Sequence, residues 1–325
     1  MTARQTYITK VAFALILSIF ATLLLILPAK ATPGSAMASQ DEPYRIESFD
    51  ISTPGKLNVE TSGGHITVKG SSDNSVRVEM YVRKNGRNLL PEDNNLDDWD
   101  IDISQSGRSV QAIAKRRGNN GWNIFGKNNN PSISFVVYTP REMSTDLNTS
   151  GGHIEARGLS GNQELTTSGG HLQLANLKGT IQARTSGGHV EIADVQGDVD
   201  ARTSGGHIDV QNSEGNLKVK TSGGHIDLAN ISGSVEARTS GGSISADLNS
   251  IGQFVDLRTS GGNVDISVPE NLGLDLNLEG SYVSTNLHNF SGNVERNEVH
   301  GKLNGGGPKI SARTSGGTVS LSFKQ

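Results

Sequence analysis

Cysteine is absent from this chain of 325 residues. Disulfides, thiolate metal sites and cysteine nucleophiles are therefore excluded, and so is the lipid-accepting cysteine of a bacterial lipoprotein. Aromatic residues make up only 5% of the chain and the hydrophobic set 34%, which is little for a compact domain. A surplus of positive charge is also missing, because the formal net charge is −4. This charge argues against a nucleic acid partner, since phosphate binding requires a basic patch.

Proline is scarce, with 9 residues, whereas glycine is abundant, with 40. The glycines do not follow the three-residue period of collagen, so they indicate many turns rather than a fibre.

Long apolar runs are absent except near the N-terminus, where residues 11–27 are interrupted only by Ser18 and Thr22. Basic residues precede this run, and Ala29-Lys30-Ala31 follows it. The pattern predicts a signal peptide over residues 1–31, cleaved after Ala31. The alternative is an uncleaved anchor, which would touch the membrane only through residues 11–27. In both cases we expect an exported protein, periplasmic or on the cell surface, with a flexible linker over residues 32–42.

What the chain does contain is a repeat. Thr-Ser-Gly-Gly occurs nine times, and five successive steps from Thr149 to Thr239 are 18 residues long. Each repeat holds two short runs of alternating apolar and polar residues, typical of half-buried strands. The Ser-Gly-Gly and Ser-Gly pairs between the runs, such as Ser222-Gly223-Gly224 and Ser232-Gly233, predict turns in which glycine supplies positive φ.

The identity of the repeats distinguishes a solenoid from a series of hairpins. In a solenoid each position stacks on its own copy in the next coil, about 4.8 Å away, so identical residues form ladders. We expect a ladder of threonine hydroxyls and an asparagine ladder at the position of Asn176, Asp194, Asn212 and Asn230. The sequence therefore predicts an all-β fold, a single-stranded parallel β-helix with right-handed coils of about 18 residues.

Three parts of this solenoid differ in regularity. We expect an irregular N-terminal part over residues 43–148, regular coils over 149–262 and a C-terminal capping part over 263–325. Candidate strands in the first part are Lys56–Thr61, His65–Lys69, Ser75–Arg83 and Ile133–Tyr138, whereas residues 84–131 are expected to be a polar excursion. The last part has alternating runs at Leu272–Leu278 and Tyr282–Leu287. Atypical terminal coils cover the open core of a solenoid.

This layout resembles the bacterial envelope family DUF4097, whose members are described as candidate adhesins. The resemblance covers residues 43–325 and rests on Pro54-Gly55-Lys56-Leu57-Asn58-Val59, on the repeats from Thr149, and on the Gly-rich segment from Gly305 to Val319. It implies an exported β-helix. It implies little about activity, because the adhesin description is itself an inference and no catalytic residues define the family.

Six of the eight histidines occupy one position of the repeat, directly after Thr-Ser-Gly-Gly. Five are consecutive and His65 is distant. Two residues further on, most repeats carry a carboxylate, and residues i and i+2 of a strand share a face. Three hypotheses follow: a stabilising surface ladder, a pH-responsive surface, or a site for a divalent transition metal, since imidazole binds Zn, Cu and Ni. The candidate metal ligands are His153, His171, His189, His207, His225, Glu191, Asp209 and Asp227.

No catalytic cluster stands out. Glycoside chemistry requires one unique pair of carboxylates, whereas here the acids recur in register. The acidic run at residues 92–100 is expected to be a solvated loop. We therefore predict that the chain is not an enzyme and needs no cofactor, apart from the metal of the alternative above.

Aromatic side chains in the polar excursion are the candidates for partner binding. Trp99, Trp122 and Phe125 lie in segments rich in polar residues, where they either anchor a partner or cap the first coils. We expect an adhesin-like interaction or scaffold protein of the cell envelope whose partner is an envelope protein or a polysaccharide. The alternative is a metal-binding or pH-sensing envelope protein.

Overall fold

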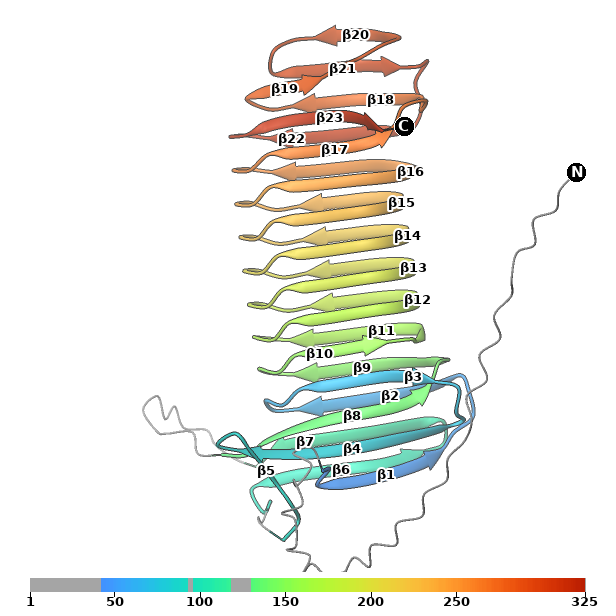
Figure 1. Ribbon diagram of the computed structural model, residues 1–325, viewed down its shortest axis with the longest axis vertical. Coiled ribbons are helices and arrows are strands. Elements are labelled where there is room, and N and C mark those ends of the chain that lie inside the picture. The colour runs from blue at the N-terminus through green and yellow to red at the C-terminus, as the bar shows by residue number, and fades with distance from the viewer. Residues whose placement is uncertain (1–41, 93–95, 118–129, 325) are drawn as a thin grey trace, which may run out of the picture. The chain divides into compact units, whose positions relative to one another are not determined.

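The computed structural model describes residues 42–92, 96–117 and 130–324, within the unit Gln40–Gln325. The predicted signal peptide and almost all of the predicted linker lie outside the described residues. The described residues form strands joined into one continuous sheet network and no helix, which confirms the all-β solenoid (Figure 1). Within this part, no helix is long and apolar enough to cross a membrane.

The regular coils are built from long strands that each cross two faces of the solenoid. These strands are β12 (Leu172–Arg184), β13 (Val190–Arg202), β14 (Ile208–Lys220), β15 (Ile226–Arg238) and β16 (Ile244–Thr259). Neighbours run parallel, and Leu172 pairs with Val190, 18 residues later. Two shorter strands, β10 (Ile154–Arg157) and β11 (Ser160–Thr167), form the coil before them.

Four of these five strands, β12 to β15, bend at an asparagine or aspartate in the left-handed region. Asn176, Asp194, Asn212 and Asn230 have φ between 53° and 58°, a conformation that Asn and Asp tolerate better than most residues. Gly233 and its equivalents also have positive φ, as predicted for the Ser-Gly turn. The predicted side-chain ladder forms in part, because Asn212 donates to Asp194 at 2.9 Å and Asn230 donates to Asn212 at 3.1 Å.

The bend divides every coil into two faces with a thin core between them. Alternate residues point inward on both faces, and Leu172, Leu174, Ile181 and Ala183 are all buried. The alternation read from the sequence is therefore the inward–outward alternation of the strands. We call the outer side of the sheet that contains Leu172–Ala175 the histidine face and the opposite outer side the arginine face.

The N-terminal part does not follow chain order. Its strands are β1 (Arg45–Asp50), β2 (Gly55–Thr61), β3 (Ile66–Ser71), β4 (Ser75–Lys84), β5 (Arg87–Leu89), β6 (Trp99–Ser106), β7 (Ser109–Arg116), β8 (Ser132–Pro140) and β9 (Met143–Thr149). β2 lies between β7 and β9, and β3 lies between β8 and β10. An early coil is thus inserted between strands that come later in the chain.

The C-terminal part repeats this arrangement at the other end. Its strands are β17 (Val264–Pro269), β18 (Leu274–Glu279), β19 (Tyr282–Thr285), β20 (Phe290–Val294), β21 (Glu298–Leu303), β22 (Lys309–Thr314) and β23 (Thr318–Lys324). β22 lies between β16 and β18, and β23 between β17 and β19. Thr61 consequently pairs with Thr149, and Thr259 with Thr314, so both long gaps in the repeat are closed in space.

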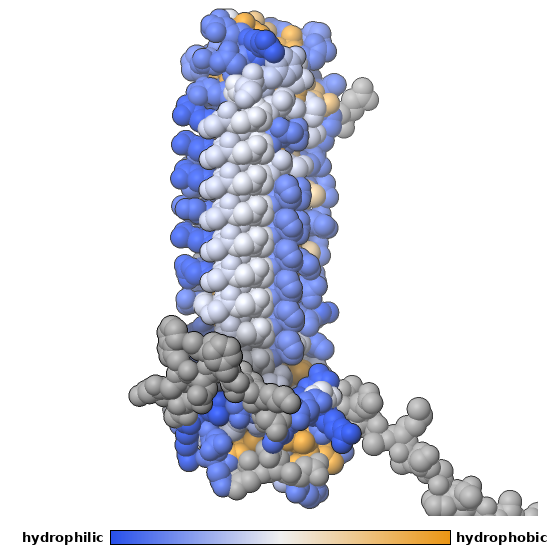
Figure 2. All heavy atoms as spheres, turned by 90° about the vertical axis from the view of Figure 1, so that its left-hand side faces the viewer, coloured by the Kyte–Doolittle hydropathy of each residue, from blue (hydrophilic) through white to orange (hydrophobic). Residues whose placement is uncertain are grey.

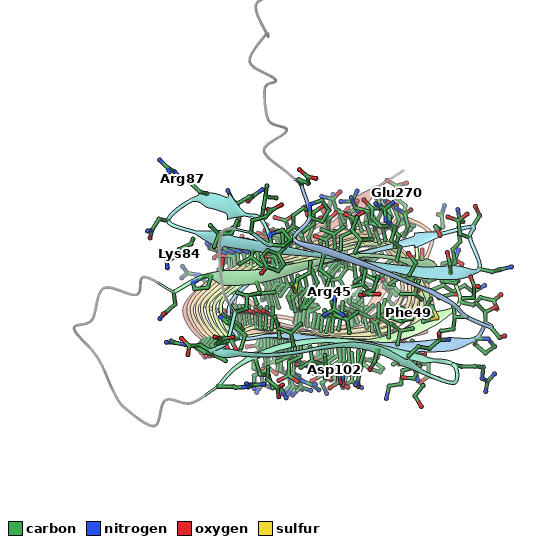
Figure 3. The ribbon with its side chains drawn as sticks, turned by 90° about the horizontal axis from the view of Figure 1, so that it is seen from below. Arg45, Phe49, Lys84, Arg87, Asp102 and Glu270 are labelled. Atoms are coloured by element: carbon green, nitrogen blue, oxygen red, sulfur yellow. The ribbon has the colours of Figure 1, made fainter. Side chains whose placement is uncertain are left out.

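Antiparallel strands finish both ends. β1, β4 and β8 form one antiparallel set, β6 pairs with β7, and β20 with β21. Figure 3 shows Arg45 and Phe49 over the space between the two sheets at the N-terminal end, where Arg45 pairs with Glu47 at 2.9 Å. The prediction of a polar excursion over residues 84–131 was wrong for β5, β6 and β7. Ile101, Ile103, Ala112 and Ala114 alternate with polar residues there, which is the pattern of a half-buried hairpin.

Candidate functional site

The corner made by Thr-Ser-Gly-Gly is held by its threonine. The hydroxyl of Thr203 donates to the carbonyl of Gly188, one coil earlier, at 2.8 Å, and accepts the N–H of Gly206 at 3.3 Å. The same pair of bonds recurs at every regular coil. The predicted threonine ladder is therefore a buried, regular column in which each hydroxyl bridges two backbone groups.

The two glycines of the corner are needed for different reasons. A Cβ on Gly206, the second glycine, would overlap the backbone carbonyl of Gly188, because successive corners stack closely. A Cβ on Gly205 would lie an ordinary 3.7 Å from the nearest backbone oxygen. Neither Gly205 nor Gly223 has the positive φ that was predicted for it. The corner thus requires glycine for close approach rather than for backbone conformation.

The histidine that follows each corner begins a continuous column on the histidine face. The histidine column consists of His65, His153, His171, His189, His207 and His225. Ring centroids of successive members lie 4.8–5.2 Å apart, and their planes are within 13° of parallel. His65 was not among the candidate residues, although it carries the same Thr-Ser-Gly-Gly-His-Ile signal. The inserted coil brings it next to His153.

Each ring also accepts a hydrogen bond from the backbone. The N–H of His171 donates to Nδ1 of His153 at 2.8 Å, and the same bond recurs up the column to Ser243, whose N–H donates to Nδ1 of His225 at 2.9 Å. A neutral imidazole has one N–H and one acceptor nitrogen. Because Nδ1 accepts in all six rings, the hydrogen-bond network assigns the proton to Nε2.

Other acceptors fill the same position where histidine is absent. Ser134 accepts the N–H of His65 at 3.0 Å through its hydroxyl, and Ser243 accepts the N–H of Asn263 at 3.0 Å. Asn263 in turn accepts the N–H of Thr318 at 2.9 Å. The position therefore requires an acceptor, which histidine, serine and asparagine all supply.

A second column runs beside the histidines on the same face. The acidic column consists of the aligned residues Glu155, Gln173, Glu191, Asp209 and Asp227. It separates two shallow recesses, one lined by His65, His153 and His171, the other by Ala175, Ala193 and Gln211.

The acidic column concentrates negative charge. Partial burial and the nearby carboxylates of Asp227 and Glu191 raise the pKa of Asp209, against the opposing effect of His207 and His189. The pKa of His65 is lowered by burial, by His153 and by Arg83. In the coil of His65 the position of the acidic column is occupied by Thr67, which is aligned with Glu155, so this coil adds no carboxylate to the column.

The hypothesis of a metal site finds little support in this geometry. Among the residues that the structure describes, no group of three His, Asp or Glu side chains is placed to hold a metal ion. Metal binding at Nε2 would also move the ring proton to Nδ1, where it would face the backbone N–H that Nδ1 now accepts. All eight candidate ligands lie on the histidine face, but in two parallel columns. The histidine column contains His153, His171, His189, His207 and His225, and the acidic column contains Glu191, Asp209 and Asp227.

The arginine face is neutralised by ion pairs. Asp200 accepts two hydrogen bonds of 2.7 Å from Arg202, and Asp256 pairs with Arg238 at 3.2 Å and with Arg258 at 2.8 Å. Figure 2 shows the corners as a pale strip flanked by hydrophilic side chains on both sides. In the sequence, an arginine or lysine precedes most regular corners and a histidine follows most of them.

The aromatic candidates for partner binding are not a surface cluster in the described part of the chain. Trp99 is only 7% exposed and belongs to the core, because it begins the inner row of β6. A partner cannot stack on its ring in this arrangement. Trp122 and Phe125 lie outside the described residues.

Comparisons with known proteins give several distant structural neighbours and one family model. A candidate lipid-binding protein from Parabacteroides distasonis is 16% identical, with 86% of this chain and 96% of that chain covered and a TM-score of 0.44. A candidate adhesin from Parabacteroides distasonis is 14% identical, with 87% of this chain and 98% of that chain covered and a TM-score of 0.33. A candidate adhesin from Bacteroides fragilis is 10% identical, with 88% of this chain and 99% of that chain covered and a TM-score of 0.31. None of the curated proteins matches. The family model described as Toastrack DUF4097 matches residues 36–322, so the chain belongs to that family.

Proposed function

We propose that the protein is an exported, non-enzymatic binding protein of the cell envelope that holds an extended polar polymer along its histidine face. One observation carries this proposal: the acidic column on β10 and β12–β15 and the histidines directly before these strands recur from coil to coil in register. A catalytic centre depends on one unique arrangement of groups. A surface that repeats about every 4.8 Å suits a partner that also repeats.

The chemistry of the histidine face favours a polysaccharide as the partner. The outward Nε2–H groups are donors, and the acidic column supplies acceptors, so hydroxyl groups find both kinds of partner. A protein partner would instead require buried apolar or aromatic anchors. In the described residues the exposed large apolar side chains are Ile46, Phe254, Tyr282 and Val294, and none lies on the histidine face of the regular coils.

Affinity for linear polysaccharide fragments of increasing length tests this proposal. We expect affinity, measured by calorimetry, to rise with fragment length, because one more coil is engaged per added unit and the contacts act together. The triple variant Gln173→Ala, Glu191→Ala, Asp209→Ala should lose this binding.

A matched control comes from the same coils on the arginine face. The aligned residues Gln182, Asp200 and Lys218 can be changed to alanine together, and this variant should bind as the unaltered protein does. Binding that ignores length, binding that both variants retain, or cleavage of the polymer would contradict the proposal.

A further inference from the structure

The histidine column connects neighbouring coils through the one nitrogen of each ring that a second proton would occupy. Six backbone N–H groups, one per coil, donate to Nδ1 at 2.8–3.0 Å. The ordinary strand bonds begin one residue later, where the N–H of Leu172 donates to the carbonyl of His189. At this position the side chain is therefore the acceptor that the sheet itself does not supply.

We propose that the histidine column is an acid-sensitive set of hydrogen bonds between coils. Protonation of the rings at Nδ1 breaks the hydrogen bonds that hold successive corners together. A proton added to Nδ1 makes both ring nitrogens donors. The backbone N–H would then face another N–H. Two charged rings would also lie 4.8–5.2 Å apart, where like charges repel.

Some of the charged groups around the column favour protonation of the rings and others oppose it. Glu155, Glu191, Asp209 and Asp227 lie one column away and attract a positive ring, whereas Arg83 opposes the charging of His65. On the other side the column borders Thr-Ser-Gly-Gly, which has no titratable side chain. The carboxylates lie beside the rings, but the backbone N–H lies directly against Nδ1, so the hydrogen bond sets the direction of the response.

The sign of the effect follows from proton counting. Protonation at Nδ1 costs the folded chain one backbone hydrogen bond per coil, whereas an unfolded histidine, which titrates near pH 6.5, has no such bond to lose. Proton uptake therefore favours the unfolded chain, and we expect stability to fall as the pH falls below about 6.5. Asp209, whose pKa is raised, contributes the opposite trend, but it is present in the unaltered protein and in the histidine variants alike, so the difference between them isolates the histidines.

The chain provides its own design for the test. Because Asn263 and Ser243 accept the same backbone bond in their coils, asparagine can replace histidine at this position without losing the acceptor. The variant is His171→Asn, His189→Asn, His207→Asn in the full chain. The control is His288→Asn, His300→Asn, which changes two histidines outside the column.

Thermal unfolding between about pH 7.5 and 5 is the measurement. The unaltered protein and the control should lose melting temperature steeply as the pH falls. The triple variant should match them near the upper limit and lose about half as much, because three of the six column rings have been replaced. Long-range proton–nitrogen NMR of the unaltered protein should show the proton on Nε2.

Three outcomes would overturn the proposal. They are a melting temperature of the unaltered protein that does not change over this interval, a triple variant with the same pH dependence, and rings protonated on Nδ1 near neutral pH. Should the triple variant fail to fold, His189→Asn alone and the NMR assignment still decide.

Discussion

At the scale of single residues, the threonine, the second glycine and the histidine of Thr-Ser-Gly-Gly-His each have a role in the hydrogen bonding of the corner. The threonine hydroxyl bridges two coils, the second glycine allows their carbonyls to stack, and the histidine ring accepts the next N–H. Buried or closely packed polar groups require partners. The motif is thus a way of hydrogen-bonding a tight corner, which explains why it recurs where no ligand is implied.

The two glycines of one corner should respond differently to alanine. Gly206→Ala should lower the free energy of unfolding by about 1–3 kcal/mol, the usual cost of overpacking, because the added Cβ overlaps the Gly188 carbonyl. Gly205→Ala should change it by less than about 0.5 kcal/mol. Urea denaturation of both variants is the measurement, and equal losses would refute the close-approach explanation.

At the scale of the elements, the sequence predicted the strands of the regular coils well and the corners less well. The alternation of apolar and polar residues is a local signal that predicts which side chains of a strand point inward. Leu172, Leu174, Ile181 and Ala183 follow it. The left-handed bend at Asn176 and the Nδ1 bonds of the histidines were not predictable, because both depend on the backbone of the next coil. The same reason led to the wrong φ for Gly205.

The acidic column of these elements is expected to contain a destabilising charge. The folded pKa of Asp209 is raised, so its protonated form is favoured by folding and its ionised form is disfavoured. Stability from this group is present below its unfolded pKa of 3.8 and is lost as the pH rises through the higher folded value. Asp209→Asn should therefore raise the melting temperature near neutral pH but not below about pH 3.8.

The opposite face provides the control for this change. Asp200→Asn removes the ion pair with Arg202 and should cost about 0.2–1 kcal/mol, as expected for a largely exposed pair. Calorimetric melting of both variants over a range of pH is the measurement. A lower melting temperature for Asp209→Asn near neutral pH would show that the acidic column stabilises the fold.

At the scale of the whole described unit, the ends of the solenoid are built differently from its middle. Antiparallel strands and the inward-facing pair Arg45–Glu47 finish the N-terminal end, and the β20–β21 hairpin finishes the other. Inward charges and short edge strands are known ways of preventing edge-to-edge association. The sequence indicated irregular ends but not their topology, because the pairing of β2 with β9 joins segments that are far apart in the chain.

Removal of both ends should make the regular coils associate. A fragment of residues 149–262 lacks β3, the partner of β10, and also β17 and β22, the partners of β16, which leaves unpaired backbone groups at both edges. Light scattering should show association or precipitation of the fragment at a concentration where the chain from residue 32 onward stays monodisperse. A folded, monomeric fragment would mean that the terminal strands are not needed as covers.

The insertion of one coil at each end has a consequence for biogenesis. Thr61 pairs with Thr149, so the coil of β2 cannot complete its pairing until a segment 88 residues later in the chain has been made. Val264 pairs with Val319, so β23 is added beside a strand that precedes it in the chain. Such non-local pairing is slow, and chains emerge N-terminus first. The protein therefore cannot wind progressively from its beginning as it is made. Its completion depends on its final residues, so a premature stop near the C-terminus should be as damaging as the loss of a central coil.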